Sequence, residues 1–161
     1  MLDEQWFGRK NVFNIQKEMS WKATADKIAF PDDRQHTWQK YVDAQRLEIS
    51  CGEAPYLVSR YDTVTGEAIP ISQRIGLLDR KLRVVSENTD TEEEWFTWTK
   101  RAFQSVYGFE YQGDSLLLAR ENLFVTFVEV YRERFGKLPH LRQMKVIANI
   151  IAWNLWHSVS C

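Results

Sequence analysis

The sequence predicts one α/β domain that combines a partial parallel sheet with a large helical complement and a small β-hairpin insertion. Two short apolar segments, 46–50 and 106–110, have the composition of strands, and helical periodicity follows each of them. Alternation of strands with helices is typical of parallel sheets. A length of 161 residues suits one domain with its own hydrophobic core and is short for two.

The predicted domain covers residues 1–161 and falls into three parts. Residues 1–35 are the least regular segment. Residues 36–135 contain the strand ends and turns on which the candidate chemistry depends, and residues 136–161 form a C-terminal helix with a short tail. No internal repeat or low-complexity segment interrupts this organisation, so we treat the chain as a single domain.

The first half of the chain contains several short predicted elements. Residues 12–15 and 27–30 alternate weakly between polar and apolar side chains, which makes both segments candidate strands. Residues 37–44 are a candidate short helix with apolar side chains on one face. Residues 46–50 alternate more clearly and run into Cys51-Gly52, which is the pattern of a strand that ends in a tight turn.

Between the two main strands the sequence predicts a helix start, a hairpin and a second helix. Pro55 suits the first turn of a helix, where its missing N–H is not needed. Residues 61–71 contain Thr65-Gly66 between two runs that favour strands, which predicts a small hairpin. From Ile71 to Val85 the apolar residues recur every three or four positions, which predicts a helix.

The second half of the chain is predicted to be mainly helical. Residues 91–94 form a capping-box pattern that opens a helix rich in aromatic residues. The strand at 106–110 follows, and residues 113–136 then form a long helix that Gly136 ends. The last predicted helix begins near Pro139 and carries apolar residues as far as Leu155.

Composition argues against a chain that grips DNA or enters a membrane by itself. The net charge is −1, whereas a dedicated DNA-binding domain usually carries a basic excess. No apolar run approaches the roughly 20 residues of a membrane span, and the acidic start of the chain is unlike a signal peptide. Cys51 and Cys161 make no disulfide framework. We therefore expect a cytoplasmic protein with no membrane partner.

The first candidate site lies where the strand at 46–50 ends, because open α/β sheets bind ligands at the carboxyl ends of their strands. A small turn lets the backbone approach a ligand closely, and a carboxylate accepts hydrogen bonds from an amino group or a hydroxyl. The segment resembles the first motif of class I, S-adenosylmethionine-dependent DNA methyltransferases of restriction-modification systems. The matching positions are Glu48, Cys51, Gly52, Tyr56 and Leu57.

The second candidate site ends the strand at 106–110 and resembles the second motif of the same family. An apolar strand leads to an acid, Glu110, and the following helix contains Ala119-Arg120 and Asn122-Leu123. The resemblance implies that Glu110 holds both ribose hydroxyls of S-adenosylmethionine. Glu110 and the adjacent Tyr111 are therefore the expected contacts to the adenosine part of the cofactor.

Taken together, the two motifs imply a partial Rossmann-like methyltransferase domain. The resemblance identifies the chain as the N-terminal, cofactor-binding part of an adenine-specific DNA methyltransferase, which transfers a methyl group to the exocyclic amine of adenine. The chain departs from the family at three places: Ile49 stands where proline is usual, Ala54-Pro55 where a second glycine is usual, and Gln112-Gly113 where Asp-Pro is usual.

The catalytic tetrapeptide of the family, Asn/Asp-Pro-Pro-Tyr/Phe, does not occur in this sequence. In the family it orients the target amine and stacks on a base that has been flipped out of the duplex. We therefore expect no methyl transfer by this chain alone. We expect the chain to reach DNA through a larger complex, together with other restriction-modification subunits or a second polypeptide that carries the catalytic half.

Two other functions stay open at this point. A catalytically inactive, methyltransferase-like module could bind a protein or act as an inhibitor in a restriction or defence complex, and the near-neutral charge favours this. In that case part of the interface consists of Trp153 and Trp156, which lie three positions apart in the last predicted helix. The alternative is that these two rings fill the core of the domain itself. A nuclease is the other alternative, because Pro31-Asp32 and Asp79-Arg80-Lys81 superficially resemble a nuclease metal site, although the second group lies in a helical pattern.

Overall fold

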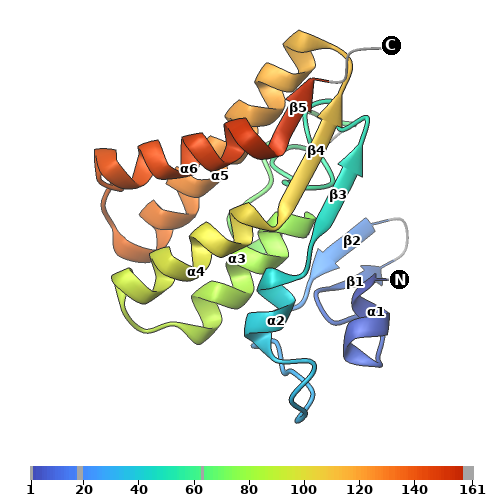
Figure 1. Cartoon of the computed structure of the whole chain (residues 1–161). Helices are drawn as coiled ribbons and strands as arrows, with labels where there is room; N and C mark the ends of the chain where they lie inside the picture. Colours follow the sequence, from blue (N-terminus) through green and yellow to red (C-terminus); the bar gives the residue numbers. More distant parts are fainter. Residues whose placement is uncertain (1, 18–19, 63, 158–161) are drawn as a thin grey trace.

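The computed structural model describes residues 2–17, 20–62 and 64–157 (Figure 1). Its elements are, in chain order, α1 (Leu2–Phe7), β1 (Asn14–Lys17), β2 (Ser20–Ala23), α2 (Trp38–Asp43), β3 (Arg46–Ile49), the short 3-10 helix η1 (Ile71–Gln73), α3 (Leu77–Asn88), α4 (Glu92–Gln104), β4 (Val106–Glu110), α5 (Gly113–Phe135), α6 (Leu141–Asn154) and β5 (Leu155–His157). The chain is a mixed α/β protein, as its sequence predicts.

A three-stranded parallel sheet has the order β3-β4-β5, so β4 lies in its centre. Arg46 pairs with Val106, and Gly108 pairs with Leu155. Helices α3 and α4 connect the first two strands, and α5 and α6 connect the last two. The two strands predicted from apolar segments are therefore confirmed, and the parallel arrangement follows from their helical connections.

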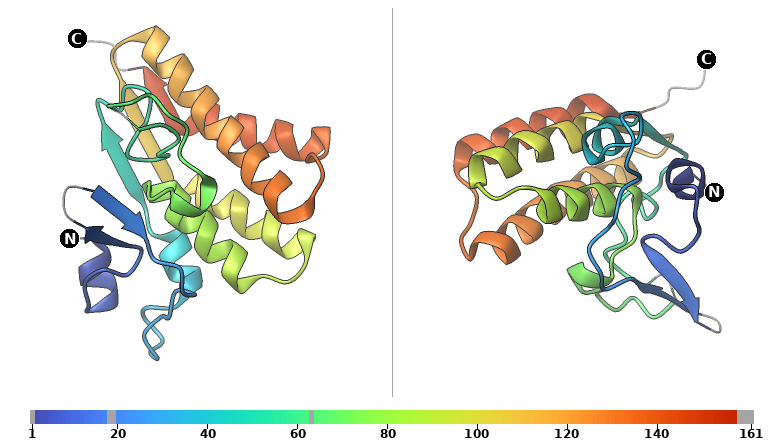
Figure 2. Two further views of the ribbon diagram at one scale, coloured as in Figure 1. Left: turned by 180° about the vertical axis from the view of Figure 1, so that it is seen from behind. Right: turned by 90° about the horizontal axis from the view of Figure 1, so that it is seen from below.

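Helix α5 packs against β4 and β5 and covers one face of this sheet (Figures 1 and 2). Because side chains alternate along a strand, every second residue points to that face. In β4 these residues are Val106, Gly108 and Glu110, and all three are buried. Glu48 of β3 is buried on the same side. The sheet is thus a half-covered layer whose buried side includes two carboxylates.

The four long helices pack around Trp95 of α4, which is fully buried. Its ring lies 5.4 Å from the ring of Phe135, 5.7 Å from Tyr131 and 6.3 Å from Phe127, measured between centroids. The indole N–H donates to the hydroxyl of Ser86 in α3 at 2.9 Å. Aromatic rings from α4 and α5 therefore form the centre of the core, and the partner of the indole N–H comes from α3.

Both predicted ends of the long helices are confirmed. The hydroxyl of Thr91 accepts the backbone N–H of Glu94 and so caps the start of α4. Gly136, with a φ of 68°, ends α5 in the left-handed conformation, and its N–H donates to the carbonyl of Arg132 at 2.9 Å. Glycine adopts this conformation without the penalty that a side chain imposes.

The N-terminal segment contains helix α1, which was not predicted, and the antiparallel pair β1–β2. The candidate strand at 12–15 is confirmed in part by β1, but the candidate strand at 27–30 is wrong. In that segment the N–H of Ile28 donates to the carboxylate of Glu87 in α3 at 2.8 Å. The segment is therefore bonded to a helix side chain instead of to a neighbouring strand.

The helix expected to start at Pro55 is absent, because residues 54–58 form turns. The carbonyl of Tyr56 accepts the N–H of Leu77 at 2.7 Å, and the carbonyl of Leu57 accepts the N–H of Leu78 at 2.8 Å. These two N–H groups belong to the first turn of α3, where a helix offers no acceptor of its own. The segment after Pro55 therefore caps another helix instead of forming one.

The predicted hairpin at 61–71 is reduced to a single antiparallel bridge between Tyr61 and Ala68, and Thr63 lies outside the described residues. The last predicted helix is confirmed up to Asn154, where β5 begins directly. Trp156 therefore lies in a strand and not on a helix face beside Trp153. In the part of the chain that the structure describes, every helix is too short or too polar to span a lipid bilayer.

Candidate functional site

The structure brings four of the six predicted site residues together at the carboxyl edge of the sheet. Glu48 and the Cys51-Gly52 turn belong to β3 and the segment after it, and Glu110 ends the neighbouring strand β4. The N–H of Cys51 donates to the carbonyl of Phe109 at 2.8 Å, which extends the ladder between the two strands by one bond. The turn after β3 is thereby held against the end of β4.

The turn after β3 has an unusual backbone. Ser50, Gly52 and Ala54 all have positive φ values, of 54°, 52° and 62°. For Ser50 and Ala54 this left-handed conformation costs on the order of 1–3 kcal/mol each, and such outliers gather at functional sites and ligand clamps. The backbone N–H of Gly52 is directed by this turn toward Glu110.

The carboxylate of Glu110 accepts three backbone N–H groups. Gly52 donates to Oε2 at 2.5 Å, while Tyr111 and Gln112 donate to Oε1 at 2.8 and 3.0 Å. The N–H groups of Gln112 and Gly52 contribute most to holding the pKa of Glu110 below its ordinary value. A carboxylate offers about four acceptor positions. These three backbone donors therefore leave about one acceptor position of the carboxylate free.

Glu48 has the opposite electrostatic environment. Burial raises the pKa of Glu48 to about 7, although backbone N–H groups of Tyr56 and Leu57 oppose the shift. The bond from Leu57 N–H to Oε2 is 3.1 Å long. The edge of the sheet therefore holds one carboxyl group that takes up a proton near neutral pH and one, Glu110, that stays ionised.

Cys51 has the environment of a structural thiol. Burial, followed by the charges of Glu48 and Glu110, raises the pKa of Cys51 to about 11. Its Sγ lies over Gly108, where an added Cβ would stand 3.2 Å from the sulfur. Because the thiolate is the nucleophilic form, a buried thiol with a raised pKa is poorly suited to nucleophilic attack. Glycine at position 108 instead allows the turn to close over the central strand.

The two aromatic residues of the predicted site, Tyr56 and Tyr111, lie at the surface. The side chain of Tyr56 is 75% exposed, and Tyr111 is also exposed. The backbone of each residue is bonded within the site, since the carbonyl of Tyr56 caps α3 and the N–H of Tyr111 donates to Glu110. Their rings are free of packing constraints from the core and available to stack on a ligand.

The residues of the nuclease alternative serve the fold instead. Asp79 and Lys81 lie in α3, and both are buried. Asp79 accepts the N–H of Ser59 at 2.7 Å, and the Lys81 ammonium donates to the carbonyl of Val42 at 3.0 Å. No group of three or more metal-binding side chains occurs among residues 2–17, 20–62 and 64–157. The geometry gives no support to a nuclease.

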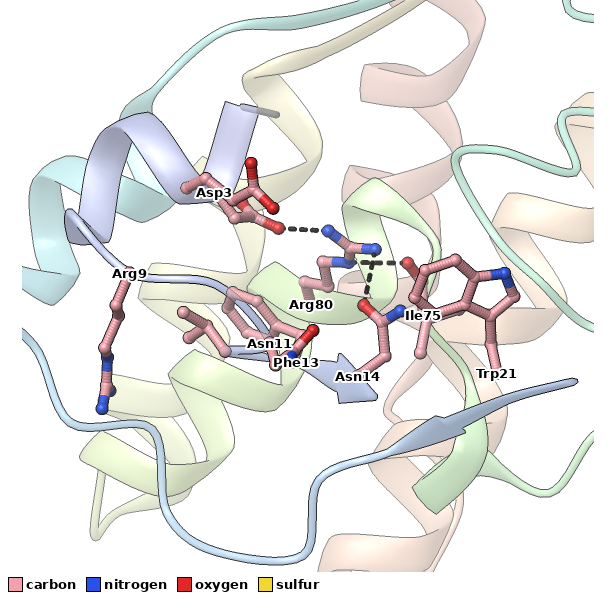
Figure 3. A pocket seen from close by; sticks show the side chains of 10 residues that line it. Asp3, Arg9, Asn11, Phe13, Asn14, Trp21, Ile75 and Arg80 are labelled. Carbon is pink, nitrogen blue, oxygen red and sulfur yellow. Dashed lines mark hydrogen bonds and ion pairs between the residues drawn. The ribbon is translucent and has the colours of Figure 1, made fainter. Parts of the chain in front are cut away.

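A pocket of about 290 Å³ that sequence reasoning missed lies between α1, β1, β2 and the start of α3 (Figure 3). The Arg80 guanidinium in its wall donates to the carbonyl of Ile75 at 2.7 Å and to the Asn14 amide oxygen at 3.3 Å. It also forms an ion pair with Asp3. Asn14 and Asp3 are distant from Arg80 in the sequence, so no local motif announces the arrangement. This guanidinium holds the N-terminal segment against α3.

A second cavity, of about 530 Å³, lies between α3 and α5 and has a mainly apolar wall that includes Leu82 and Val130. Arg83 in its wall donates to the carboxylate of Glu87 at 2.7 Å. Neither cavity contains the six predicted site residues.

The site thus consists of two carboxyl groups at the ends of adjacent parallel strands, one with a raised pKa and one with a lowered pKa. A strained turn and two exposed tyrosine rings lie in the segments that follow these strands. Comparisons of the chain with family models, with curated proteins and with solved structures found no match.

Proposed function

We propose that this chain is the cofactor-binding part of a restriction-modification DNA adenine methyltransferase, and that it binds S-adenosylmethionine at the carboxyl edge of a partial Rossmann-like sheet. The observation that carries the proposal is the meeting of Glu48, the Cys51-Gly52 turn and Glu110 on two adjacent parallel strands. Ligands of open α/β sheets bind at this edge. Both motifs that resemble the methyltransferase family contribute to it.

Each residue has a distinct part in the proposed binding. The ionised carboxylate of Glu110 accepts one ribose hydroxyl at the position that its three backbone donors leave free. Glu48 accepts a bond from the amino group of the methionine part when it is ionised, which occurs above a pKa of about 7. The exposed rings of Tyr56 and Tyr111 stack on the adenine base.

The cofactor supplies an electrophilic methyl group on its sulfonium, and the acceptor in the proposal is the exocyclic amine of adenine in DNA. This chain has no residues that match the catalytic tetrapeptide of the family. The proposal therefore assigns base recognition and catalysis to a catalytic half outside these 161 residues or to other restriction-modification subunits. The proposed location is the cytoplasm, which a buried free thiol at Cys51 favours.

One observation favours a second candidate function, a catalytically inactive module or inhibitor that binds a protein in a restriction or defence complex. The face of the sheet opposite α5 carries exposed apolar side chains, which include Ile49 and Trp156. Exposed apolar side chains that lie together on one face make that face a candidate interaction site. This candidate does not require the cofactor to bind.

Calorimetric titration with S-adenosylmethionine tests the first candidate. We expect binding by the natural chain and about fivefold weaker binding by a Tyr56→Ala variant, because loss of one stacked ring costs about 1 kcal/mol. Tyr61→Ala is the matched control, since Tyr61 is also an exposed tyrosine but belongs to the bridge at 61–68. Absence of binding by the natural chain, or equal losses in both variants, contradicts the proposal.

A further inference from the structure

The cavity of about 530 Å³ between α3 and α5 is separate from the proposed cofactor site, because none of the six predicted site residues lines it. Its wall comes from η1, α3, α5 and the segment after β2, and the side chains of Ile71, Leu82 and Val130 make much of that wall apolar. Pockets for small molecules have volumes of about 300–1,000 Å³ and combine apolar walls with a few polar groups. The polar groups of this wall therefore indicate which ligand it suits.

Arg74 is a buried cation in this wall, and one of its nitrogen donors is unused. Its side chain is only 6% exposed. The guanidinium donates from Nε to the carbonyl of Ile69 at 2.9 Å and from Nη1 to the carboxylate of Glu129 at 2.6 Å. Its Nη2 has no hydrogen-bond acceptor within residues 2–17, 20–62 and 64–157. The carboxylate of a ligand is the acceptor that best complements a guanidinium.

Asp79 is a buried anion in the same wall, and one of its oxygens is unused. Oδ2 accepts the N–H groups of Ser59 and Gly76 at 2.7 and 3.0 Å. Within the described part of the chain, no group donates to Oδ1. Burial raises the pKa of Asp79, and the charge of Arg74 opposes this shift, so the two side chains lie close enough to interact. An ammonium group of a ligand at Oδ1 provides the missing donor and favours the ionised carboxylate.

Most other charged groups of the wall are bonded within the protein. Arg83 and Glu87 pair with each other at 2.7 Å, and Glu87 also accepts the N–H of Ile28 at 2.8 Å. This pair holds the segment after β2 against α3. Glu133 is exposed, whereas Arg134 donates to a backbone carbonyl at the end of α3 and has no described partner for its buried Nε. The wall therefore offers unused donors to an anion and one unused buried oxygen to a cation.

We propose that this cavity binds a free α-amino acid with a bulky apolar side chain. The inference goes beyond the proposed function and does not depend on the cofactor. The α-carboxylate bonds to Nη2 of Arg74, the α-ammonium group bonds to Oδ1 of Asp79, and the apolar side chain packs against Leu82 and Val130. An α-amino acid carries its two opposite charges on either side of one carbon atom. It therefore suits a guanidinium and a carboxylate that interact with each other in one wall.

Ligands with a single charge fit this wall less well. An apolar carboxylate leaves Oδ1 of Asp79 without a donor, and an apolar amine leaves Nη2 of Arg74 without an acceptor. A buried polar group that stays unpaired weakens binding, because it loses water without gaining a partner. A ligand that carries both charges satisfies both groups at once.

NMR titration of the full chain at neutral pH tests the proposal with L-leucine, L-methionine, L-phenylalanine and L-tryptophan. The methyl signals of Leu82 and Val130 report on occupancy of the cavity. Each amino acid that binds is compared with two analogues that lack one charge. For leucine these are 4-methylpentanoate, which lacks the ammonium group, and 3-methylbutylamine, which lacks the carboxylate. We expect saturable shifts with an amino acid and at least about tenfold weaker binding of both analogues.

Two variants distinguish direct contacts from effects on the fold. In Asp79→Asn we expect the amino acid to bind more weakly and the analogue without an ammonium group to bind as before. In Arg74→Gln we expect the amino acid to bind more weakly and the analogue without a carboxylate to bind as before. A purely structural effect weakens all ligands alike. Ala25→Trp narrows the cavity from an exposed position, and Ala152→Trp, at an exposed position of α6 outside the cavity, is its control.

Three outcomes overturn the proposal. The first is the absence of methyl shifts with every amino acid of the panel. The second is equal binding of an amino acid and one of its singly charged analogues, which assigns the cavity to a ligand with one charge. The third is equal weakening by Ala25→Trp and Ala152→Trp, which places the ligand outside the cavity. Each of these outcomes leaves the proposed cofactor site intact, because the titration with S-adenosylmethionine tests that site separately.

Discussion

The carboxylate of Glu110 accepts the backbone N–H of Gly52 at 2.5 Å, although 58 positions separate the two residues. This bond joins the end of the central strand to the left-handed turn that follows β3. Together with the bond from Cys51 to Phe109, it fixes the shape of the carboxyl edge of the sheet. The shape of that edge therefore depends in part on one side chain, that of Glu110.

Replacement of Glu110 by alanine removes the acceptor of three N–H groups, so we expect the turn to open locally. Amide hydrogen exchange is the measurement. We expect the amides of Gly52, Tyr111 and Gln112 to exchange at least about tenfold faster in the variant, with amides in the middle of α4 unchanged. Equal acceleration throughout the chain indicates global destabilisation instead, and unchanged exchange at Gly52 contradicts the assigned role of Glu110.

The raised pKa of Glu48 has a consequence for stability. The folded-state pKa is about 7, whereas an unfolded glutamate has a pKa of about 4.3. The contribution of Glu48 to the free energy of unfolding is therefore fully present below about pH 4 and is lost as the pH rises through about 7. Glutamine does not ionise, so we expect the Glu48→Gln variant to keep this contribution as the pH rises. At pH 8 the variant is expected to be more stable than the natural chain by about 1–2 kcal/mol, a value reduced for solvent screening.

Urea unfolding at pH 5 and at pH 8 measures the effect of Glu48→Gln. Glutamine keeps an oxygen that accepts the N–H of Leu57. The difference between the variant and the natural chain is expected at pH 8 and largely absent at pH 5. A difference of the same size at both pH values excludes titration of Glu48 as its cause.

Cys51 is expected to resist thiol reagents in the folded protein. It is buried, and its pKa is about 11. A thiol with an ordinary pKa of about 8.5 has roughly 300 times more thiolate at neutral pH. In a Cys161→Ser background, which leaves Cys51 as the sole thiol, we expect labelling at least 100 times slower than in urea. Rapid labelling under native conditions shows that the turn opens readily.

Glu129 of α5 binds two arginines from the segment before α3. Its carboxylate accepts Arg60 at 2.8 Å and Arg74 at 2.6 Å, and both guanidinium groups are largely buried. Glu129→Gln removes the negative charge and leaves two buried cations, so we expect the free energy of unfolding to fall by roughly 2 kcal/mol. Urea unfolding of the variant measures this loss. Glu133→Gln, on the same helix, is the control and is expected within about 0.5 kcal/mol of the natural chain.

The parts of the fold that the sequence predicts are those with local signals. The strand at 106–110 is a short apolar run, and α4 and α5 carry capping residues at Thr91 and Gly136. Strand β5 has no such signal, because its three residues continue an apolar helical pattern without a break. Its conformation comes from pairing with β4 and from Asn154, whose amide donates to the carbonyl of Val106 at 3.1 Å.

The candidate site likewise has features that local sequence signals predict and features that they do not. The sequence places Glu48, Cys51, Gly52 and Glu110 at the ends of two predicted strands, and the structure brings these residues together. The bond from the Gly52 N–H to the Glu110 carboxylate depends on the left-handed turn at the end of another strand. Such a turn is not encoded by local propensity, since Ser50 and Ala54 normally avoid it.

The order of strands in the sheet also affects how the chain folds as it is made. Among the residues that the structure describes, strand β3 pairs with β4 alone, and Arg46 is separated from its partner Val106 by 60 positions. At a synthesis rate of 5–20 residues per second, β3 waits about 3–12 s for a partner. During that interval an apolar strand with two unpaired edges is exposed, which favours association with other chains. We expect the nascent chain to need chaperone protection until β4 has emerged.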